Sequence, residues 1–164
     1  MNRRELIAGA ALLGAGLTAS GTARAQSMDA ASQASFDTVM AFMGALGGGD
    51  MDTASALMAD DMVWHNEGDK SLPWIGHWEG KEAIFGFLGD FSAGFQVTHW
   101  ENQDAFALGD TVAVFGQMNG ITPNSGKETG LFTFALRAKV RDGKVVLWNW
   151  LEDSYALSQA YNNT

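Results

Sequence analysis

Near its C-terminal end the chain places two tryptophans and a carboxylate at alternating positions. Trp148, Trp150 and Glu152 follow one another at intervals of two, along a segment over 144–151 whose alternation predicts a strand. Alternate side chains of a strand share one face, so the three lie together. A carboxylate among tryptophans loses hydration, which raises its pKa towards the range of general acid or base chemistry. Glu152 is therefore a catalytic candidate, and the alternative is a rim carboxylate that is solvated or paired with Arg137.

His65 is the second catalytic candidate. It lies in a short alternating segment over 61–66, in which Trp64 and Asn66 share one face and His65 points to the other. A single β-bulge would turn His65 to the face of Trp64, and bulges are common beside active sites. Without such a bulge, His65 points away from that face.

The sequence gives little support to a metal or cofactor site. The three histidines match no compact ligand spacing, and the chain has no cysteine for a thiolate ligand. The glycines at 44–49 follow no predicted strand, so they do not indicate a phosphate-binding loop. We expect no metal and no cofactor.

These candidates need a scaffold, and the periodicity of the chain supplies one. Apolar residues recur at helical spacing between 36 and 46, and glycines at 47–49 end that helix. Asp50 or Asp52 can cap a second helix, and a third follows Gly80. Alternation of period two then predicts strands at 96–108, 111–120, 131–140 and 144–151. Helices followed by a meander of strands predict an α+β domain with the helices on one sheet face.

Three short motifs resemble one known superfamily. They are Gly-Asp-Met-Asp at 49–52, Ala-Asp-Asp at 59–61 and Gly-His-Trp-Glu-Gly at 76–80. The chain thereby resembles the SnoaL-like and ketosteroid-isomerase-like branch of the nuclear transport factor 2-like superfamily, over about residues 31–161. The resemblance implies a cone-shaped, curved antiparallel sheet wrapped around three N-terminal helices, with a pocket at its open end. This cone serves many chemistries, so fold alone does not give function.

The resemblance also locates the positions that carry ketosteroid isomerase chemistry. Asn66 stands where the family has its general-base aspartate, Phe42 where it has a tyrosine that binds the enolate oxygen, and Ala135 where it has a protonated aspartate. An amide cannot accept a proton near neutral pH, and neither Phe42 nor Ala135 can donate a hydrogen bond from its side chain. Steroid isomerisation by that mechanism is therefore not expected.

If Asn66 faces the interior of the cone, alternation along the other strands predicts a pocket for a small hydrophobic molecule. The predicted binding residues are Phe42, Trp64, Asn66, Phe115, Gln117, Asn119, Thr133, Arg137, Trp148 and Trp150. The alternative for the tryptophans is that they fill the core behind the helices.

The same register predicts an apolar outer sheet face, which favours a homodimer formed through the sheets. The predicted outer residues are Val112, Val114, Met118, Phe132, Phe134, Leu136 and Ala138. A register one residue off would instead make these side chains the core and move the pocket to the alternate set.

Residues 1–25 resemble a twin-arginine export signal, which leaves residues 26–164 as the SnoaL-like domain. Arg3 and Arg4 precede an apolar run, and Ala23-Arg24-Ala25 predicts cleavage before Gln26. Cleavage changes the net charge from −9 to −11, because Arg3, Arg4, Arg24 and Glu5 are removed. So acidic a protein is expected to bind neither nucleic acid nor, after cleavage, a membrane. We expect it in the periplasm or secreted.

Two functional hypotheses follow. The first is an acid–base enzyme without metal, an isomerase, cyclase or dehydratase acting on a hydrophobic carbonyl compound, with Glu152 or His65 moving the proton. The second is a non-catalytic binding protein that has lost the ketosteroid isomerase residues. A titratable side chain in the cavity with a shifted pKa would favour the enzyme.

Overall fold

The computed structural model describes residues 28–162, which form four helices and seven strands. In chain order these are α1 (Ala30–Gly48), α2 (Met51–Leu57), β1 (Met58–Glu67), β2 (Gly76–Glu79), α3 (Lys81–Gly94), β3 (Gln96–Leu108), β4 (Thr111–Thr122), β5 (Lys127–Glu128), β6 (Phe132–Arg141), β7 (Lys144–Glu152) and α4 (Ser154–Asn162). The predicted leader, residues 1–25, lies outside the described part. No described helix is long and apolar enough to cross a membrane.

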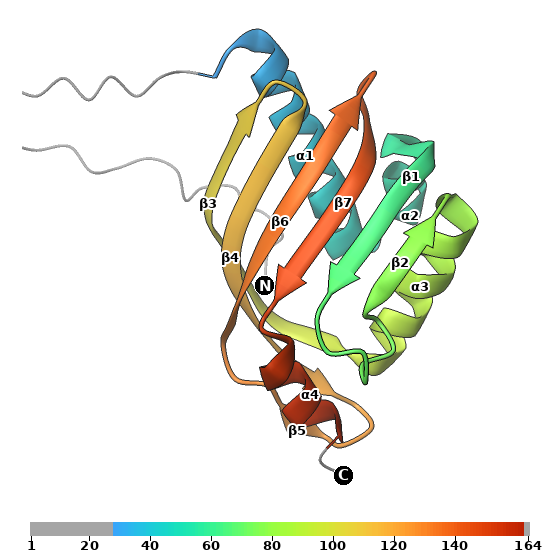
Figure 1. The fold of residues 1–164 in the computed structure, drawn as a ribbon, viewed down its shortest axis with the longest axis vertical. Coiled ribbons are helices and arrows are strands. Elements are labelled where there is room, and N and C mark those ends of the chain that lie inside the picture. Colours follow the sequence, from blue (N-terminus) through green and yellow to red (C-terminus); the bar gives the residue numbers. More distant parts are fainter. Residues whose placement is uncertain (1–27, 163–164) are drawn as a thin grey trace, which may run out of the picture.

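One curved, open sheet organises the domain, and α1, α2 and α3 cover one of its faces (Figure 1). The strand order is β2-β1-β7-β6-β4-β3, with β5 added to β4. The α+β class and the cone architecture are thus confirmed. The sheet is mixed, however, because β1 pairs with β7 in parallel. Turn residues indicate antiparallel hairpins only, so the sequence carried no local sign of a pairing between the two ends of the domain.

Two aspartates and a glycine set the limits of the first two helices. Asp29 caps α1 by accepting a hydrogen bond from the backbone N–H of Ser32, and Gly49 ends it in the left-handed conformation at φ 70°. Asp50 then caps α2 through the backbone N–H of Thr53. The predicted helix end and the predicted cap at Asp50 are confirmed.

The helix-facing side of the sheet carries the apolar side chains of every central strand. Register pairs Trp148 with Ala138 and Trp150 with Leu136, so these four point to the same side. All the residues predicted for the outer face are buried on this helix-facing side. They are Val112, Val114, Met118, Phe132, Phe134, Leu136 and Ala138. The alternative register is therefore the correct one for β4 and β6. A sheet covered on one face buries its more apolar set of side chains.

With this register, five predicted pocket residues lie on the opposite, outer face. They are Phe115, Gln117, Asn119, Thr133 and Arg137. Phe42, Trp64, Asn66, Trp148 and Trp150 are buried on the helix side as predicted. A slip of one residue exchanges the two faces of a strand, which explains why the errors fall on whole strands.

The C-terminal helix α4 and strand β2 were not predicted. Helix α4 packs at the narrow end of the domain beside β5 (Figure 1). There Ala160 O accepts hydrogen bonds from the hydroxyls of Thr122 and Ser125. Ser154 Oγ also accepts from the backbone N–H of Asp69, which ties the loop after β1 to α4.

Candidate functional site

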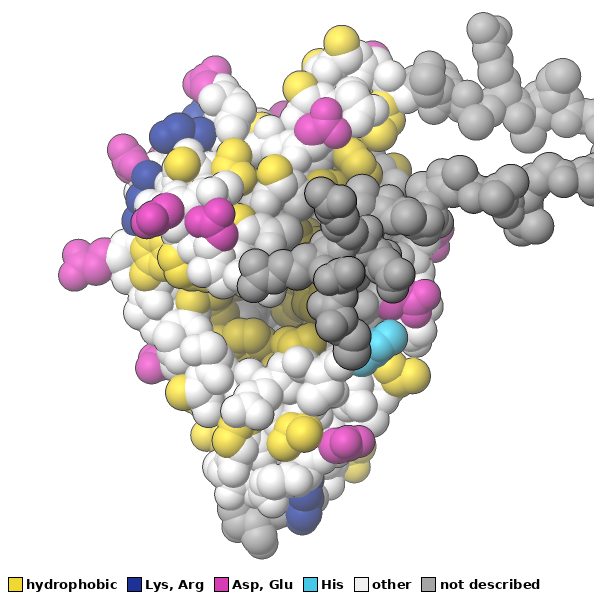
Figure 2. All heavy atoms as spheres, turned by 180° about the vertical axis from the view of Figure 1, so that it is seen from behind, with side chains coloured by type: hydrophobic (Ala, Val, Ile, Leu, Met, Phe, Trp, Pro, Cys, Tyr) yellow, Lys and Arg dark blue, Asp and Glu magenta, His cyan; other side chains and the backbone are white. Residues whose placement is uncertain are grey.

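The helix side of the molecule is hollowed near its middle, with hydrophobic side chains at the bottom of the hollow (Figure 2). We call this feature the helix-side hollow. It lies on the covered face of the sheet, the face to which Trp150 and Glu152 point. The aromatic side chains of that face form two groups with different exposure.

The first group is a closed aromatic core. Phe42 of α1 meets Trp148 edge to face, with ring centroids 5.1 Å apart, and Trp148 lies 5.2 Å from Trp64. Phe87 of α3 completes the group at 5.3 Å from Trp64. All four are buried, so they hold α1 and α3 on the sheet as core residues do. Trp148 therefore fills the core behind the helices, as the alternative interpretation of the tryptophans predicted.

The second group is a stack that solvent reaches. Phe134 and Trp150 lie parallel with centroids 4.6 Å apart, and Trp100 of β3 lies against both rings at 4.6 and 5.5 Å. Trp100 is 39% exposed although it faces the helices. Its indole N–H donates to Asn102 Oδ1, and Asn102 Nδ2 contacts Met43 Sδ of α1. These contacts fix a flat apolar wall on which a ring system could stack.

Glu152 lies at the end of this wall. Trp150 Nε1 donates a hydrogen bond to Glu152 Oε2 at 2.8 Å. Burial raises the pKa of Glu152 from 4.5 to about 7, and the hydrogen bond from Trp150 opposes part of that rise. Glu152 Oε1 is buried and has no hydrogen-bond partner among the described residues. Of the two interpretations of this carboxylate, the desolvated one with a raised pKa describes its surroundings and the rim one does not, and its catalytic role stays a prediction.

Trp74 brings a second polar group close to Glu152. Its side chain is fully buried in the loop between β1 and β2, among the rings of Phe91, Phe95 and Tyr161 at 5.2 to 6.0 Å. Within residues 28–162, its indole N–H has no hydrogen-bond partner. This indole nevertheless lowers the pKa of Glu152, so the two side chains are close without forming a well-aligned bond.

Asn66 has a structural task. Its Oδ1 accepts a hydrogen bond from Trp64 Nε1 at 2.7 Å, and its Nδ2 donates to Trp74 O at 2.8 Å. The amide therefore connects β1 to the loop that carries Trp74. This position, where the resemblance places a general base, positions neighbouring side chains instead.

His65 lies apart from Glu152. The register shift of β1 falls between Met58 and Val63, before His65, so His65 stays on the outer face and the bulge that its candidacy required is missing there. It pairs across the strands with His77 of β2, with rings 5.6 Å apart and Glu67 at 3.9 Å. In the described part of the chain, no group of three or more histidines or carboxylates could hold a metal ion.

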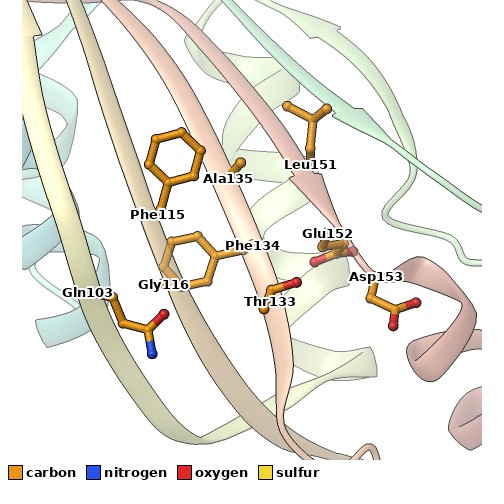
Figure 3. A pocket seen from close by; sticks show the side chains of 9 residues that line it. All are labelled: Gln103, Phe115, Gly116, Thr133, Phe134, Ala135, Leu151, Glu152 and Asp153. Atoms are coloured by element: carbon orange, nitrogen blue, oxygen red, sulfur yellow. The ribbon is translucent and has the colours of Figure 1, made fainter.

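The outer face carries a shallow groove of about 560 Å³ (Figure 3). It crosses four strands and is lined by Gln103, Phe115, Thr133, Ala135, Leu151 and Asp153. Glu152 borders this groove as well, but its bond to Trp150 holds the carboxylate at the helix side. Gln117 donates to Glu101 and Asn119 accepts from Thr129, so both amides serve the outer surface. Arg137 stands opposite Asn149 on this face and cannot pair with Glu152.

Residues 39–148 match the family model of the SnoaL-like domain. The chain belongs to this family. Among solved structures, an NTF2-like protein of Burkholderia xenovorans LB400 is similar to this SnoaL-like domain with 26% identity and a TM-score of 0.73, over 80% of this chain and 98% of that one. No protein with curated annotation matches the sequence.

Two further structures share the fold of this SnoaL-like domain. A putative SnoaL-like polyketide cyclase from Jannaschia sp. CCS1 has a TM-score of 0.71 at 17% identity, over 85% of this chain and 99% of that one. A putative isomerase from Bacillus subtilis has a TM-score of 0.67 at 18% identity, over 80% and 95%. At these identities the likeness concerns the fold alone.

Sequence reasoning missed Trp74 and Trp100. Trp100 and Asn102 alternate in a predicted strand, and that spacing could have placed them on one face. Register shifts in β3 on both sides of this pair, between Val97 and His99 and between Asn102 and Asp104, prevented the sequence from predicting which face the pair occupies. Trp74 lies in a loop, where no periodicity indicates orientation.

Proposed function

We propose that this SnoaL-like domain is an acid–base enzyme that binds a flat, hydrophobic carbonyl compound in the helix-side hollow. The observation that carries the proposal is Glu152, a buried carboxylate with a pKa of about 7 at the end of an aromatic wall. General acid–base catalysis is most effective when the pKa of the catalytic group lies near the working pH. Two proteins of the same fold are named as a polyketide cyclase and an isomerase, which agrees with this class of reaction.

The step assigned to Glu152 is a proton transfer. Its ionised carboxylate removes a proton from the carbon next to the carbonyl, and the electron pair moves to the carbonyl oxygen to form an enolate. The same carboxyl then returns the proton to another carbon, which isomerises the compound. Trp150 holds Oε2 through its indole N–H, so Oε1 is the oxygen left to take the proton.

The replacement of the ketosteroid isomerase groups favours a second candidate, a non-catalytic binding protein. Asn66 is engaged in holding Trp64 and Trp74, Phe42 is buried in the core, and Ala135 lies on the outer face. In that case the hollow would bind a molecule without changing it. Turnover decides between the two candidates.

Native mass spectrometry of the protein isolated from the periplasm of its host is the first experiment. A co-purified small molecule would give the ligand class, and its turnover by the purified protein would separate enzyme from binder. A mass that begins at Gln26 would support the export signal that we propose for residues 1–25. A full-length mass, or protein found only in the cytoplasm, would contradict export.

With a substrate in hand, Glu152→Gln tests the catalytic role. We expect kcat to fall by about 10²- to 10⁴-fold, because an amide cannot take up the proton. For the wild type, kcat/KM should rise about tenfold per pH unit below 7 and level off above, since the ionised carboxylate is the base.

Glu101→Gln is the matched control for this substitution. Glu101 is exposed and bonds Gln117 on the outer face, so the variant makes the same chemical change away from the hollow. Its activity should stay within about twofold of the wild type, as for surface substitutions remote from the site. Equal activity of Glu152→Gln and wild type would end the proposal.

A further inference from the structure

Two unsatisfied polar groups of complementary type lie close together beside the aromatic wall. Within the described residues, Trp74 Nε1 is a buried donor and Glu152 Oε1 a buried acceptor, and neither has a partner. Leaving such a group unsatisfied costs the free energy of removing it from water without a replacement hydrogen bond. A third group that accepts from the indole and donates to the carboxylate would remove both costs.

The donor is held firmly in place. Asn66 Nδ2 fixes the backbone of Trp74 through its carbonyl, and the rings of Phe91, Phe95 and Tyr161 surround the indole. A Cβ on Gly94 would lie 2.7 Å from the ring of Trp74, so the ring also occupies the space that this glycine leaves. The indole therefore keeps its direction whether or not a ligand is present.

The acceptor is equally well fixed. Trp150 Nε1 holds Oε2 of Glu152 at 2.8 Å, which leaves Oε1 as the oxygen without a partner in the described residues. Trp150 also belongs to the stack with Phe134 and Trp100. A flat ligand lying on that stack would bring a substituent at its edge to Glu152.

We propose that Trp74 Nε1 and Glu152 Oε1 form a two-point site for a hydroxyl on an aromatic or enolic ring. A hydroxyl oxygen accepts from the indole, and its proton is donated to the carboxylate. This proposal rests on the proposed function and narrows it: the compound bound is a phenol, or an enol whose oxygen Trp74 stabilises while Glu152 handles the proton. Trp74 is then a binding residue, and Asn66 positions it.

Paired probes test the site on the full chain. 2-Naphthol and naphthalene have the same ring system and differ by one hydroxyl. We expect the wild type to bind 2-naphthol about tenfold more tightly, as two modest hydrogen bonds would provide. Trp74→Phe, which keeps a ring and loses the N–H, should lower this preference to about threefold, because the bond to Glu152 remains.

Trp148→Phe is the matched control. Trp148 Nε1 is likewise buried without a partner in the described part of the chain, but its ring lies in the aromatic core around Phe42. This variant should keep the tenfold preference for 2-naphthol. An equal fall of the preference in both variants would assign it to general loosening of the core and overturn the two-point site.

A second measurement needs no variant. In the wild type, 2-naphthol should shift one buried indole N–H proton resonance downfield, and naphthalene should leave that resonance without the downfield shift, because only the hydroxyl accepts the bond. Equal affinity for both probes would overturn the two-point site and leave the aromatic hollow intact. Failure of both probes to bind would overturn the hollow as a site for flat ligands, and the proposed function with it. An unchanged indole resonance would mean that only water lies between Trp74 Nε1 and Glu152 Oε1, and it would overturn the two-point site.

Discussion

Glu152 differs from the surface carboxylates in the direction of its pKa shift. Asp60 and Asp61 are exposed and pair with Lys81 and Arg141, and these partners lower their pKa values. Glu152 has two tryptophans beside it and a raised pKa caused by burial. A group that changes charge near pH 7 inside an apolar site can donate and accept protons at little cost, which is the property that acid–base chemistry requires.

The raised pKa has a consequence for stability. Below pH 4.5 both folded and unfolded chains hold this proton, and above about pH 7 both have lost it, so the folded state then carries a buried charge. The cost of ionised Glu152 therefore appears as the pH rises through this window and reaches about 3 kcal/mol. Glu152→Gln removes it, so the free energy of unfolding of the variant minus that of the wild type should rise by about this amount from pH 4 to pH 8. Urea unfolding measures both, and a pH-independent difference would refute the raised pKa.

For single side chains, the sequence predicted which acid to consider and left open whether it is desolvated or lies at the rim. Trp150 and Glu152 stand two apart on a strongly alternating strand, so their common face and the desolvation of the carboxylate follow from local pattern. Trp74 could not be found in this way, because its position depends on a loop held by Asn66 and packed against α4. The two hydrogen bonds of Asn66 depend on how this loop packs against β1, which no local pattern predicts.

Helix α3 contributes Phe91 to the rings that enclose Trp74, and its glycines differ in what surrounds them. Gly94, at the end of the helix, faces the ring of Trp74, whereas a Cβ at Gly86 would meet nothing within 4 Å. The first glycine provides room for the site, and the second only weakens the helix.

Alanine substitutions at these two glycines should therefore have opposite effects. We expect Gly86→Ala to stabilise the protein by about 0.5–1 kcal/mol, since alanine favours the helix. Gly94→Ala should destabilise it by about 1–3 kcal/mol, because its methyl group would press on a buried ring that cannot move aside. Thermal unfolding followed by circular dichroism measures both. A stable Gly94→Ala variant would show that Trp74 is free to move.

The secondary structure was largely predictable, and the pairing of strands was not. Alternation predicted β3 with its observed bounds and placed β4, β6 and β7 within one or two residues, because period two is a local property. The choice of buried face failed for β4 and β6, where it was carried over from Asn66 through strands that are not neighbours. The apolar run of Phe132, Phe134 and Leu136 was itself the correct signal, since a covered face takes the more apolar set.

At the scale of the whole domain, several large apolar side chains of the described residues are exposed on the outer face. Phe106 and Phe115 stack there with 56% and 42% of their surfaces exposed, and Leu151 is 40% exposed at the groove. Arg137 shares this face with Glu101 and Asp153, so two copies related by a two-fold axis could bring opposite charges together. We therefore propose a homodimer through this face, with residues different from those that the sequence predicted.

Phe115→Asp tests the homodimer. A charge in the centre of an interface should weaken association by at least about 30-fold and yield a monomer at micromolar concentration. Met51→Asp is the control, because Met51 is 39% exposed on α2, on the helix side of the sheet. Sedimentation velocity measures both variants and the wild type. A wild type that is strictly monomeric at micromolar concentration would contradict the dimer.

The parallel pairing of β1 with β7 also determines when the chain can fold during synthesis. Strand β7 follows every other described strand in the chain, yet it lies in the middle of the sheet, between β1 and β6. Until it emerges, β1 and β2 have no neighbour to connect them with the remaining strands. Strands β3, β4 and β6 can pair with one another, and β1 with β2, before β7 is present, but only β7 joins these two parts. Loss of residues 144–152 would therefore divide the sheet in two.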